Sequence, residues 1–139
     1  MGFDSTTWAV AESEYEGHAL FIKFREFPQS FMKWRYPQRL NIFWKMSDPD
    51  ENELPTNEEF QRLAAFEDRL VDAVEGDEHS ILLAALTCNG ESEFLFHTSD
   101  VAGFLERLTN MPQEPERYPI TIQHYLDPNW AYFDSVIAH

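Results

Sequence analysis

The chain contains a single cysteine, Cys88, among its 139 residues. An internal disulfide needs two cysteines and the common zinc sites need several, so a disulfide framework and a cysteine-based zinc site are excluded. It also lacks a run of 18 or more apolar residues, which a membrane-spanning helix requires. The first residues lack the basic and apolar regions of a signal peptide. We therefore expect a cytoplasmic protein that does not insert into a membrane.

Positive charge is scarce as well. Lys and Arg number 10 against 25 Asp and Glu, which gives a net charge of −15 at pH 7. A field of that sign repels phosphate backbones, so we expect no direct contact with nucleic acid. The same field would steer the protein towards a basic partner.

Apolar residues, in contrast, are abundant. Hydrophobic residues make up 43% of the chain and aromatic residues 15%, which is too apolar a composition for a disordered protein. A length of 139 residues suits one domain, and neither a low-complexity tract nor a Gly/Ser linker divides the sequence. We therefore predict a single domain over residues 1–139.

Alternation of apolar and polar side chains predicts several β-strands. The first two, over residues 7–14 and 17–27, form a hairpin whose turn is Tyr15-Glu16-Gly17. Further strands are predicted over residues 39–46, 81–88, 92–97 and 118–126. Asn89-Gly90 separates two of these strands, and this pair supplies the positive φ angles that a type I′ hairpin turn requires.

Apolar residues at three- and four-residue steps predict two helices, over residues 56–75 and 99–110. The apolar face of the first consists of Phe60, Leu63, Ala64, Leu70, Val71 and Val74. That of the second consists of Val101, Phe104, Leu105 and Leu108. Thr56 and Glu59 have the spacing of a capping box, in which each side chain bonds the amide of the other.

The order of these elements predicts an α+β fold, with a mostly antiparallel sheet and two helices on one face. It corresponds to a ferredoxin-like split βαβ arrangement with an added N-terminal β-hairpin. Two short helices on one face leave open what covers the other, which the hairpin or a second subunit, in a homodimer, could shield. After the last strand, Trp130 and Phe133 have the spacing to fold back and close the core, with a ligand contact as the alternative for Trp130.

Several short motifs follow one another along nearly the whole chain. They are Trp8 with Glu14-Tyr15-Glu16-Gly17, Tyr36-Pro37-Gln38-Arg39-Leu40-Asn41-Ile42, Leu54-Pro55-Thr56 before Glu67-Asp68-Arg69-Leu70, Thr87-Cys88-Asn89-Gly90, and Asp127-Pro128-Asn129-Trp130. In this order and spacing they resemble the bacterial "domain of unknown function 695" family. That family is similar in predicted topology to the ribonuclease E inhibitor family, acidic bacterial proteins that act by binding an enzyme. The resemblance implies the fold and a bacterial origin, and it supplies no catalytic residues.

The cations are concentrated in one segment. Residues 23–45 hold six cations and one acid, so the segment carries +5, and the rest of the chain, with four cations and 24 acids, carries −20. Aromatic and cationic side chains alternate within it on a predicted loop, and this mixture is typical of interface hot spots. The predicted partner-binding residues are Phe31, Lys33, Trp34, Arg35, Tyr36 and Arg39. The alternative is that Trp34 and Tyr36 pack beneath the loop while the cations pair with acidic residues elsewhere.

Patterns for metal binding or catalysis are weak. Asp48-Pro49-Asp50-Glu51-Asn52, with Glu59 at the twelfth position, resembles a calcium loop, but Glu53 replaces the required glycine. The histidines show no metal-binding spacing, although a long-range pair of His97 with His124 is left open. Cys88 ends an apolar strand, so we interpret it as a small core residue. Burial there would raise the pKa of its thiol. We predict no metal and no cofactor.

The sequence therefore predicts a non-catalytic protein that binds, and inhibits or regulates, another protein. The alternative is a small-molecule or metal-dependent enzyme with a site near residues 33–39, which would use His97, His124 or an acidic pair. A cleft with converging polar groups of shifted pKa would favour the enzyme, and a flat acidic surface would favour the binder.

Overall fold

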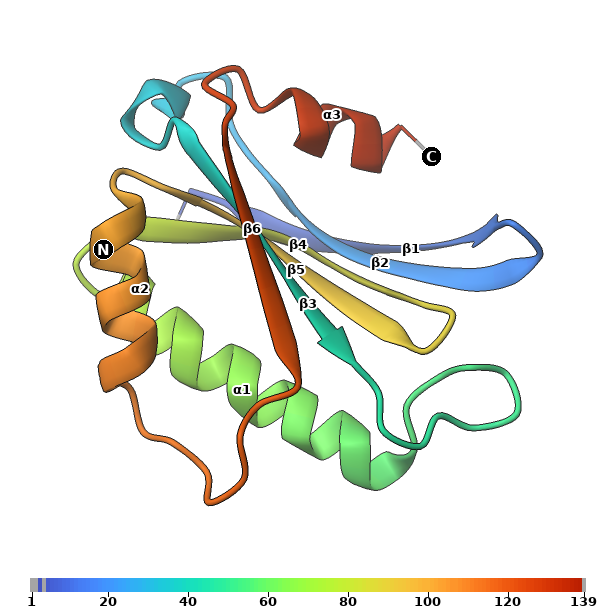
Figure 1. Ribbon diagram of the computed structural model, residues 1–139. Coiled ribbons are helices and arrows are strands. Elements are labelled where there is room, and N and C mark those ends of the chain that lie inside the picture. Colours follow the sequence, from blue (N-terminus) through green and yellow to red (C-terminus); the bar gives the residue numbers. More distant parts are fainter. Residues whose placement is uncertain (1–2, 4, 139) are drawn as a thin grey trace.

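The computed structural model describes residue 3 and residues 5–138 of the chain (Figure 1). Six strands in this part form one antiparallel sheet in the order β1-β2-β4-β5-β3-β6. The strands are β1 (Thr7–Tyr15), β2 (His18–Glu26), β3 (Gln38–Lys45), β4 (Ser80–Cys88), β5 (Glu91–Thr98) and β6 (Ile120–Leu126). The helices are α1 (Asn57–Glu75), α2 (Val101–Asn110) and α3 (Ala131–Ile137), and η1 (Lys33–Arg35) is a 3-10 turn. The predicted α+β class is confirmed.

Two-residue turns join the paired strands. Asn89 and Gly90 have φ angles of 51° and 78°, so the predicted positive-φ turn between β4 and β5 is confirmed. Glu16 and Gly17, with φ angles of 51° and 83°, form the same kind of turn between β1 and β2. In both turns the second residue is glycine, which adopts positive φ without steric cost.

The strand order places β5 between β3 and β4, the two strands that α1 connects. The β1-β2 hairpin extends the sheet, because β2 pairs with the free edge of β4 from Leu20 opposite Cys88 to Phe24 opposite Ala84. The finer ferredoxin-like assignment stays a prediction. No helix in the described residues is both long and apolar enough to cross a membrane.

The start of α1 differs from the predicted capping box. The hydroxyl of Thr56 accepts a hydrogen bond from the amide of Glu59 at 3.4 Å, as expected. The Glu59 carboxylate, however, turns into the protein, where it accepts from Trp44 Nε1 at 2.8 Å and from the amide and hydroxyl of Ser47 at 3.0 Å each. The carboxylate therefore joins the end of β3 to the start of α1.

Glu59 leads to a prediction about stability. Burial raises the pKa of its carboxyl, but the hydrogen bonds from Trp44 and Ser47 outweigh this effect and lower that pKa. We expect Glu59→Gln to lower the free energy of unfolding by about 1–3 kcal/mol, because the new amide group would face a donor and leave it unpaired. Urea unfolding would measure this loss. The exposed Glu58→Gln is the control and should change stability by at most about 0.5 kcal/mol, and equal midpoints for the two variants would contradict the prediction.

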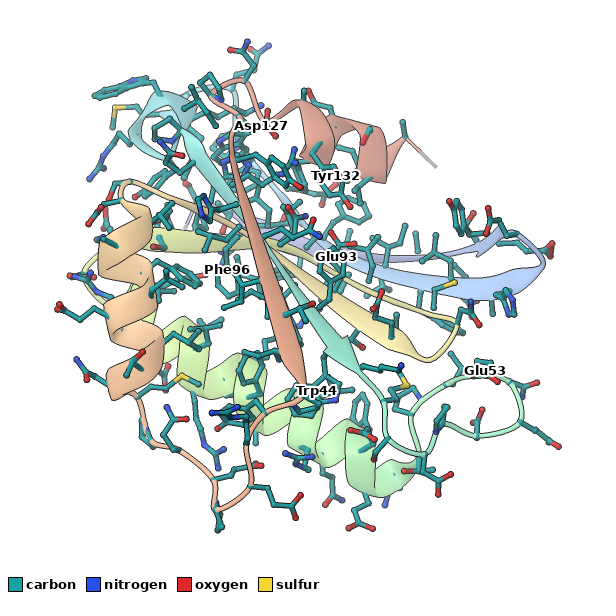
Figure 2. All side chains as sticks on the ribbon, viewed as in Figure 1. Trp44, Glu53, Glu93, Phe96, Asp127 and Tyr132 are labelled. Carbon is teal, nitrogen blue, oxygen red and sulfur yellow. The ribbon has the colours of Figure 1, made fainter. Side chains whose placement is uncertain are left out.

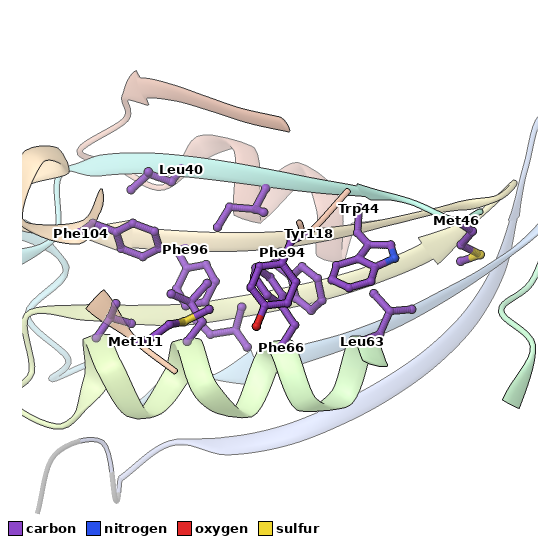
Figure 3. Packing of buried hydrophobic residues seen from close by; sticks show 14 residues of the cluster. Leu40, Trp44, Met46, Leu63, Phe66, Phe94, Phe96, Phe104, Met111 and Tyr118 are labelled. Atoms are coloured by element: carbon purple, nitrogen blue, oxygen red, sulfur yellow. The ribbon is translucent and has the colours of Figure 1, made fainter. Parts of the chain in front are cut away.

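The larger core lies between the sheet and the first two helices (Figure 3). Its centre is aromatic, with the Trp44 and Phe66 ring centroids 5.4 Å apart and those of Phe66 and Tyr118 4.8 Å apart. Phe60 was predicted to belong to this core, but 59% of its surface is exposed. The reason is that Phe60 lies at the side of the α1 apolar face, beyond the stripe formed by Leu63 and the other buried residues.

The second face of the sheet carries α3, which the sequence pattern did not predict as a helix (Figure 1). Trp130 is fully buried there and packs with Tyr36 and Phe133, so the prediction that Trp130 closes the core is confirmed. The question of what covers this face is answered in part by the C-terminal helix of the same chain, which the two suggested covers, the hairpin and a second subunit, did not include.

Candidate functional site

The predicted binding loop divides into an outward and an inward side. Trp34, in η1, points outward with 72% of its surface exposed, and the neighbouring Met32 is 50% exposed. Backbone hydrogen bonds hold the turn, from Arg35 N to Met32 O at 3.2 Å and from Tyr36 N to Lys33 O at 2.9 Å. The alternative in which Trp34 packs beneath the loop is therefore wrong.

Phe31 and Tyr36 form the inward side of the loop. The Phe31 ring lies 4.7 Å from that of Phe27 and 5.8 Å from that of Trp130 between centroids. Tyr36 is buried, and its hydroxyl donates to the carbonyl of Glu78 at 2.8 Å. Burial raises the pKa of this hydroxyl, against the opposing effect of Arg35. These two side chains pack the inward side of the loop, so the alternative interpretation is confirmed for Tyr36.

The carbonyl of Tyr36 joins the loop to the C-terminal segment. It accepts hydrogen bonds from His97 Nδ1 at 2.8 Å and from Trp130 Nε1 at 3.0 Å. Because a carbonyl only accepts, Nδ1 of His97 carries the proton and Nε2 is bare. Nε2 is buried and has no hydrogen-bond partner among residues 3 and 5–138. Burial lowers the pKa of His97 to about 4, so the ring is neutral at pH 7.

Arg39, near the start of β3, extends its side chain towards the end of β6 and the start of α3. Its Nη1 contacts Asp127 Oδ2 at 3.1 Å, and its Nε donates to Asn41 Oδ1 at 2.9 Å. Its guanidinium carbon also lies 4.5 Å from the ring centroids of both Tyr125 and Tyr132. Arg39 is thus committed to contacts within the chain, and its predicted role as a direct partner contact stays a prediction.

Acidic groups complete this network beneath α3 (Figure 2). Asp127 accepts from the amides of Ala131 and Tyr132 at 3.0 and 3.3 Å, and these bonds with that of Arg39 lower its carboxyl pKa despite the opposing effect of burial. Glu93 Oε2 accepts from Tyr132 and from Asn41 at 2.7 Å each. Burial and the nearby Glu93 raise the pKa of the Tyr132 hydroxyl. The carboxylates are therefore engaged in holding α3 on the sheet.

The cations of residues 23–45 largely meet acidic residues elsewhere in the chain. The closest nitrogen–oxygen distances run from 2.6 to 3.7 Å. The pairs are Lys23 with Glu67, Arg25 with Glu75, Arg35 with Glu78, and Arg39 with Asp127. The positive segment is thus largely neutralised within the fold, as the alternative interpretation of these cations expected, and it leaves the rest of the surface strongly acidic.

The groups named for catalysis or metal binding do not converge. His97 lies opposite Arg39, and His124 lies opposite Leu40. Because consecutive residues of a strand point to opposite faces, the two histidines lie on opposite faces of the sheet. The interpretation of His97 and His124 as a long-range pair is therefore wrong. Within the described residues no three His, Cys, Asp or Glu side chains are placed to hold a metal ion. Burial and Glu16 raise the pKa of the Cys88 thiol, which keeps it protonated at pH 7.

The residues of the calcium-like loop do not converge on one site either. Asp50 Oδ1 accepts from the amides of Asn52 and Leu54 at 2.8 and 3.1 Å, so it stabilises the loop itself. Glu59, the twelfth residue, is buried against Trp44 instead of facing Asp50.

A cavity of about 630 Å³ lies on the face of the sheet that carries α3. It is bordered by Glu93 and Tyr132, which are already hydrogen-bonded to each other.

Sequence reasoning missed two apolar residues at the end of β6. Leu126 lies opposite Gln38 and is 69% exposed, and Tyr125 beside it is also exposed. The amide of Asp127 donates to Pro37 O at 2.8 Å, which fixes this strand end next to the η1 loop. The pairing of β3 with β6 places Leu126 beside Gln38, more than 80 positions away in the sequence. No local sequence pattern predicts that register.

The chain belongs to DUF695, a family of unknown function, whose model matches residues 6–136. The resemblance inferred from the short motifs is therefore confirmed for the family. No curated protein and no solved structure matches the chain. Membership of this family assigns no activity, so the function must be inferred from the surface described above.

Proposed function

We propose that this protein is a non-catalytic binding protein of the bacterial cytoplasm that recognises a basic partner protein and inhibits or regulates it. The observation that carries the proposal is the exposed indole of Trp34, on a loop whose inward side chains are packed. With the neighbouring exposed Met32 it makes up what we call the η1 surface. Figure 1 shows η1 and the end of β6 at the same end of the molecule.

The η1 surface has the properties of a binding site. Trp and Tyr dominate interface energetics, because a large ring that is desolvated on binding contributes much affinity at little conformational cost. Phe31 and Tyr36 already pack on the inward side of the loop, so binding would order little of it. Single exposed apolar residues are ordinary, but the η1 surface combines an exposed indole with an exposed thioether side chain two residues away.

The charge of the molecule indicates the kind of partner. The net charge is −15, and four cations of the basic segment are paired within the fold. A basic partner would be attracted over a distance of about 10 Å at 0.1 M salt, and the attraction would weaken as salt rises.

The internal bonding near residues 33–39 supports a binder over an enzyme. The Tyr36 hydroxyl, His97 Nδ1 and the Arg39 guanidinium each bond other parts of the chain. The second ring nitrogen of His97, Nε2, is buried. Glu93 and Asp127 likewise accept from internal donors. Such groups position α3 and the loop, whereas an enzyme needs polar groups that face a substrate.

Truncation of Trp34 tests the proposal. We expect Trp34→Ala to weaken a partner isolated by affinity purification by about 2 kcal/mol or more, and Arg35→Ala to weaken it to a smaller extent. Because Trp34 is exposed, thermal melting should change little. Calorimetric titration against the purified partner measures the first effect, with the exposed Gln29→Ala as the control. Unchanged affinity in Trp34→Ala would contradict the proposed function.

A further inference from the structure

An open groove of about 770 Å³ lies between α1 and the β1-β2 hairpin. Strands β1, β2, β4 and β5 form its floor, and the first half of α1 forms one wall. We call it the α1 groove. Its apolar lining includes Val10, Phe21, Phe60, Ala64 and Phe94, and its acidic lining consists of Glu12, Glu67 and Asp68.

The apolar residues of the α1 groove lack cover. Val10 on β1 is 80% exposed, and Phe60 on α1 is 59% exposed. Phe60 and Ala64 are four residues apart, so they lie on one side of α1, next to the stripe that Leu63 and Phe66 bury against the sheet. The apolar face of α1 is therefore wider than the part that its own sheet covers, and the excess faces the hairpin.

The space suits a helix. Strands in a sheet are about 4.8 Å apart, and packed helices lie about 8–10 Å apart. Two strands beyond α1, namely β1 and β2, therefore provide the width of about one helix. A helix placed there would contact Val10 below and Phe60 at its side. An extended peptide on the outer edge of β1 would reach neither the wall of α1 nor Phe60.

The charge at the groove selects the occupant. Three acids, Glu12, Glu67 and Asp68, line the groove against one cation, Lys23, whose Nζ is already paired with Glu67 Oε2 at 2.6 Å. A second copy of the chain would bring identical carboxylates together across a two-fold axis, which is unfavourable. We propose that the α1 groove binds an amphipathic helix of the partner protein, with apolar residues on one face and Lys or Arg on its flanks.

This inference rests on the proposed function, because it needs a protein partner, but it concerns a different surface. The probe is a synthetic peptide of about five helical turns with Leu on one face and Lys on the other. A scrambled peptide of the same composition separates amphipathic binding from charge attraction alone. The groove variant is Val10→Thr with Phe60→Gln, which keeps strand and helix propensities, and Trp34→Ala is the matched control at the η1 surface.

Fluorescence anisotropy should show saturable binding of the amphipathic peptide to the wild type, and circular dichroism should show a gain of helix in the peptide. We expect the groove variant to bind at least tenfold more weakly and Trp34→Ala to bind as the wild type does. Equal binding of the scrambled peptide, or unchanged binding by the groove variant, would overturn the inference. Loss confined to Trp34→Ala would overturn it and leave the proposed function standing.

Sedimentation of the protein alone tests the second copy as occupant. We expect a monomer whose sedimentation is the same in the wild type and in the groove variant. A dimer that dissociates in the groove variant would overturn the inference in favour of self-association.

Discussion

Replacing Trp130 by alanine is expected to lower the free energy of unfolding by about 3–5 kcal/mol. The indole is fully buried, and its centroid lies 4.9 Å from that of His97, 5.1 Å from that of Phe27 and 5.8 Å from that of Phe31. Its removal would leave a cavity where the C-terminal segment meets the η1 loop. Urea unfolding followed by circular dichroism measures the loss.

Trp130→Phe separates the packing of the ring from its hydrogen bond. Phenylalanine keeps much of the apolar contact but cannot donate to Tyr36 O, which would retain the bond from His97. We expect Trp130→Phe to cost less than Trp130→Ala, and the exposed Trp34→Ala to cost at most about 0.5 kcal/mol. A Trp130→Ala protein as stable as Trp34→Ala would contradict the described packing of α3.

The regular elements could be predicted because their signals are local. Thr56 caps α1 at the predicted position, Asp100 caps α2 within the range predicted for that helix, and the Asn89-Gly90 turn follows from the φ angles these residues tolerate. The third helix gives no such signal. It has seven residues, its N-cap Trp130 has a left-handed φ of 58°, and the capping carboxylate comes from Asp127, three residues earlier.

The orientation of side chains on the loop could not be predicted, because a loop has no fixed period. Trp34 and Tyr36 are two residues apart, and both are aromatic residues next to cations, yet Trp34 is exposed and Tyr36 is buried. The inward orientation of Tyr36 depends on Trp130 and His97, which donate hydrogen bonds to its carbonyl from distant parts of the chain. Glu59 shows the same limit, since its preference for Trp44 over the backbone of Thr56 depends on tertiary contacts.

The two surfaces proposed for binding differ in how far sequence could reach them. The alternation of rings and cations around Trp34 marked the first. The α1 groove was hidden because the helical pattern assigned Phe60 to the core. The apolar face of a helix can be wider than the part that the sheet covers, and this excess can be recognised only when the position of the sheet under the helix is known.

Acidification is expected to destabilise the protein through His97. The pKa of this ring is about 4 in the fold, against an ordinary value of 6.5, because burial disfavours the charged form and Arg39 adds to this effect against Asp127. Between these two values the unfolded chain binds more protons than the folded one. The free energy of unfolding should therefore fall as the pH drops from 6.5 to 4, by roughly 3 kcal/mol in total at this site.

His97→Asn tests this assignment, because an asparagine amide can donate to Tyr36 O in place of Nδ1 and does not titrate. Urea unfolding at a series of pH values should give a flatter profile for this variant between pH 6.5 and 4, and the exposed His124→Asn should keep the wild-type slope. A smaller slope should remain, because burial and Arg107 also lower the pKa of His79. The lowered carboxyl pKa values of Glu59, Asp77 and Asp127 act at lower pH, below their ordinary values. An unchanged slope in His97→Asn would show that another group carries the acid sensitivity.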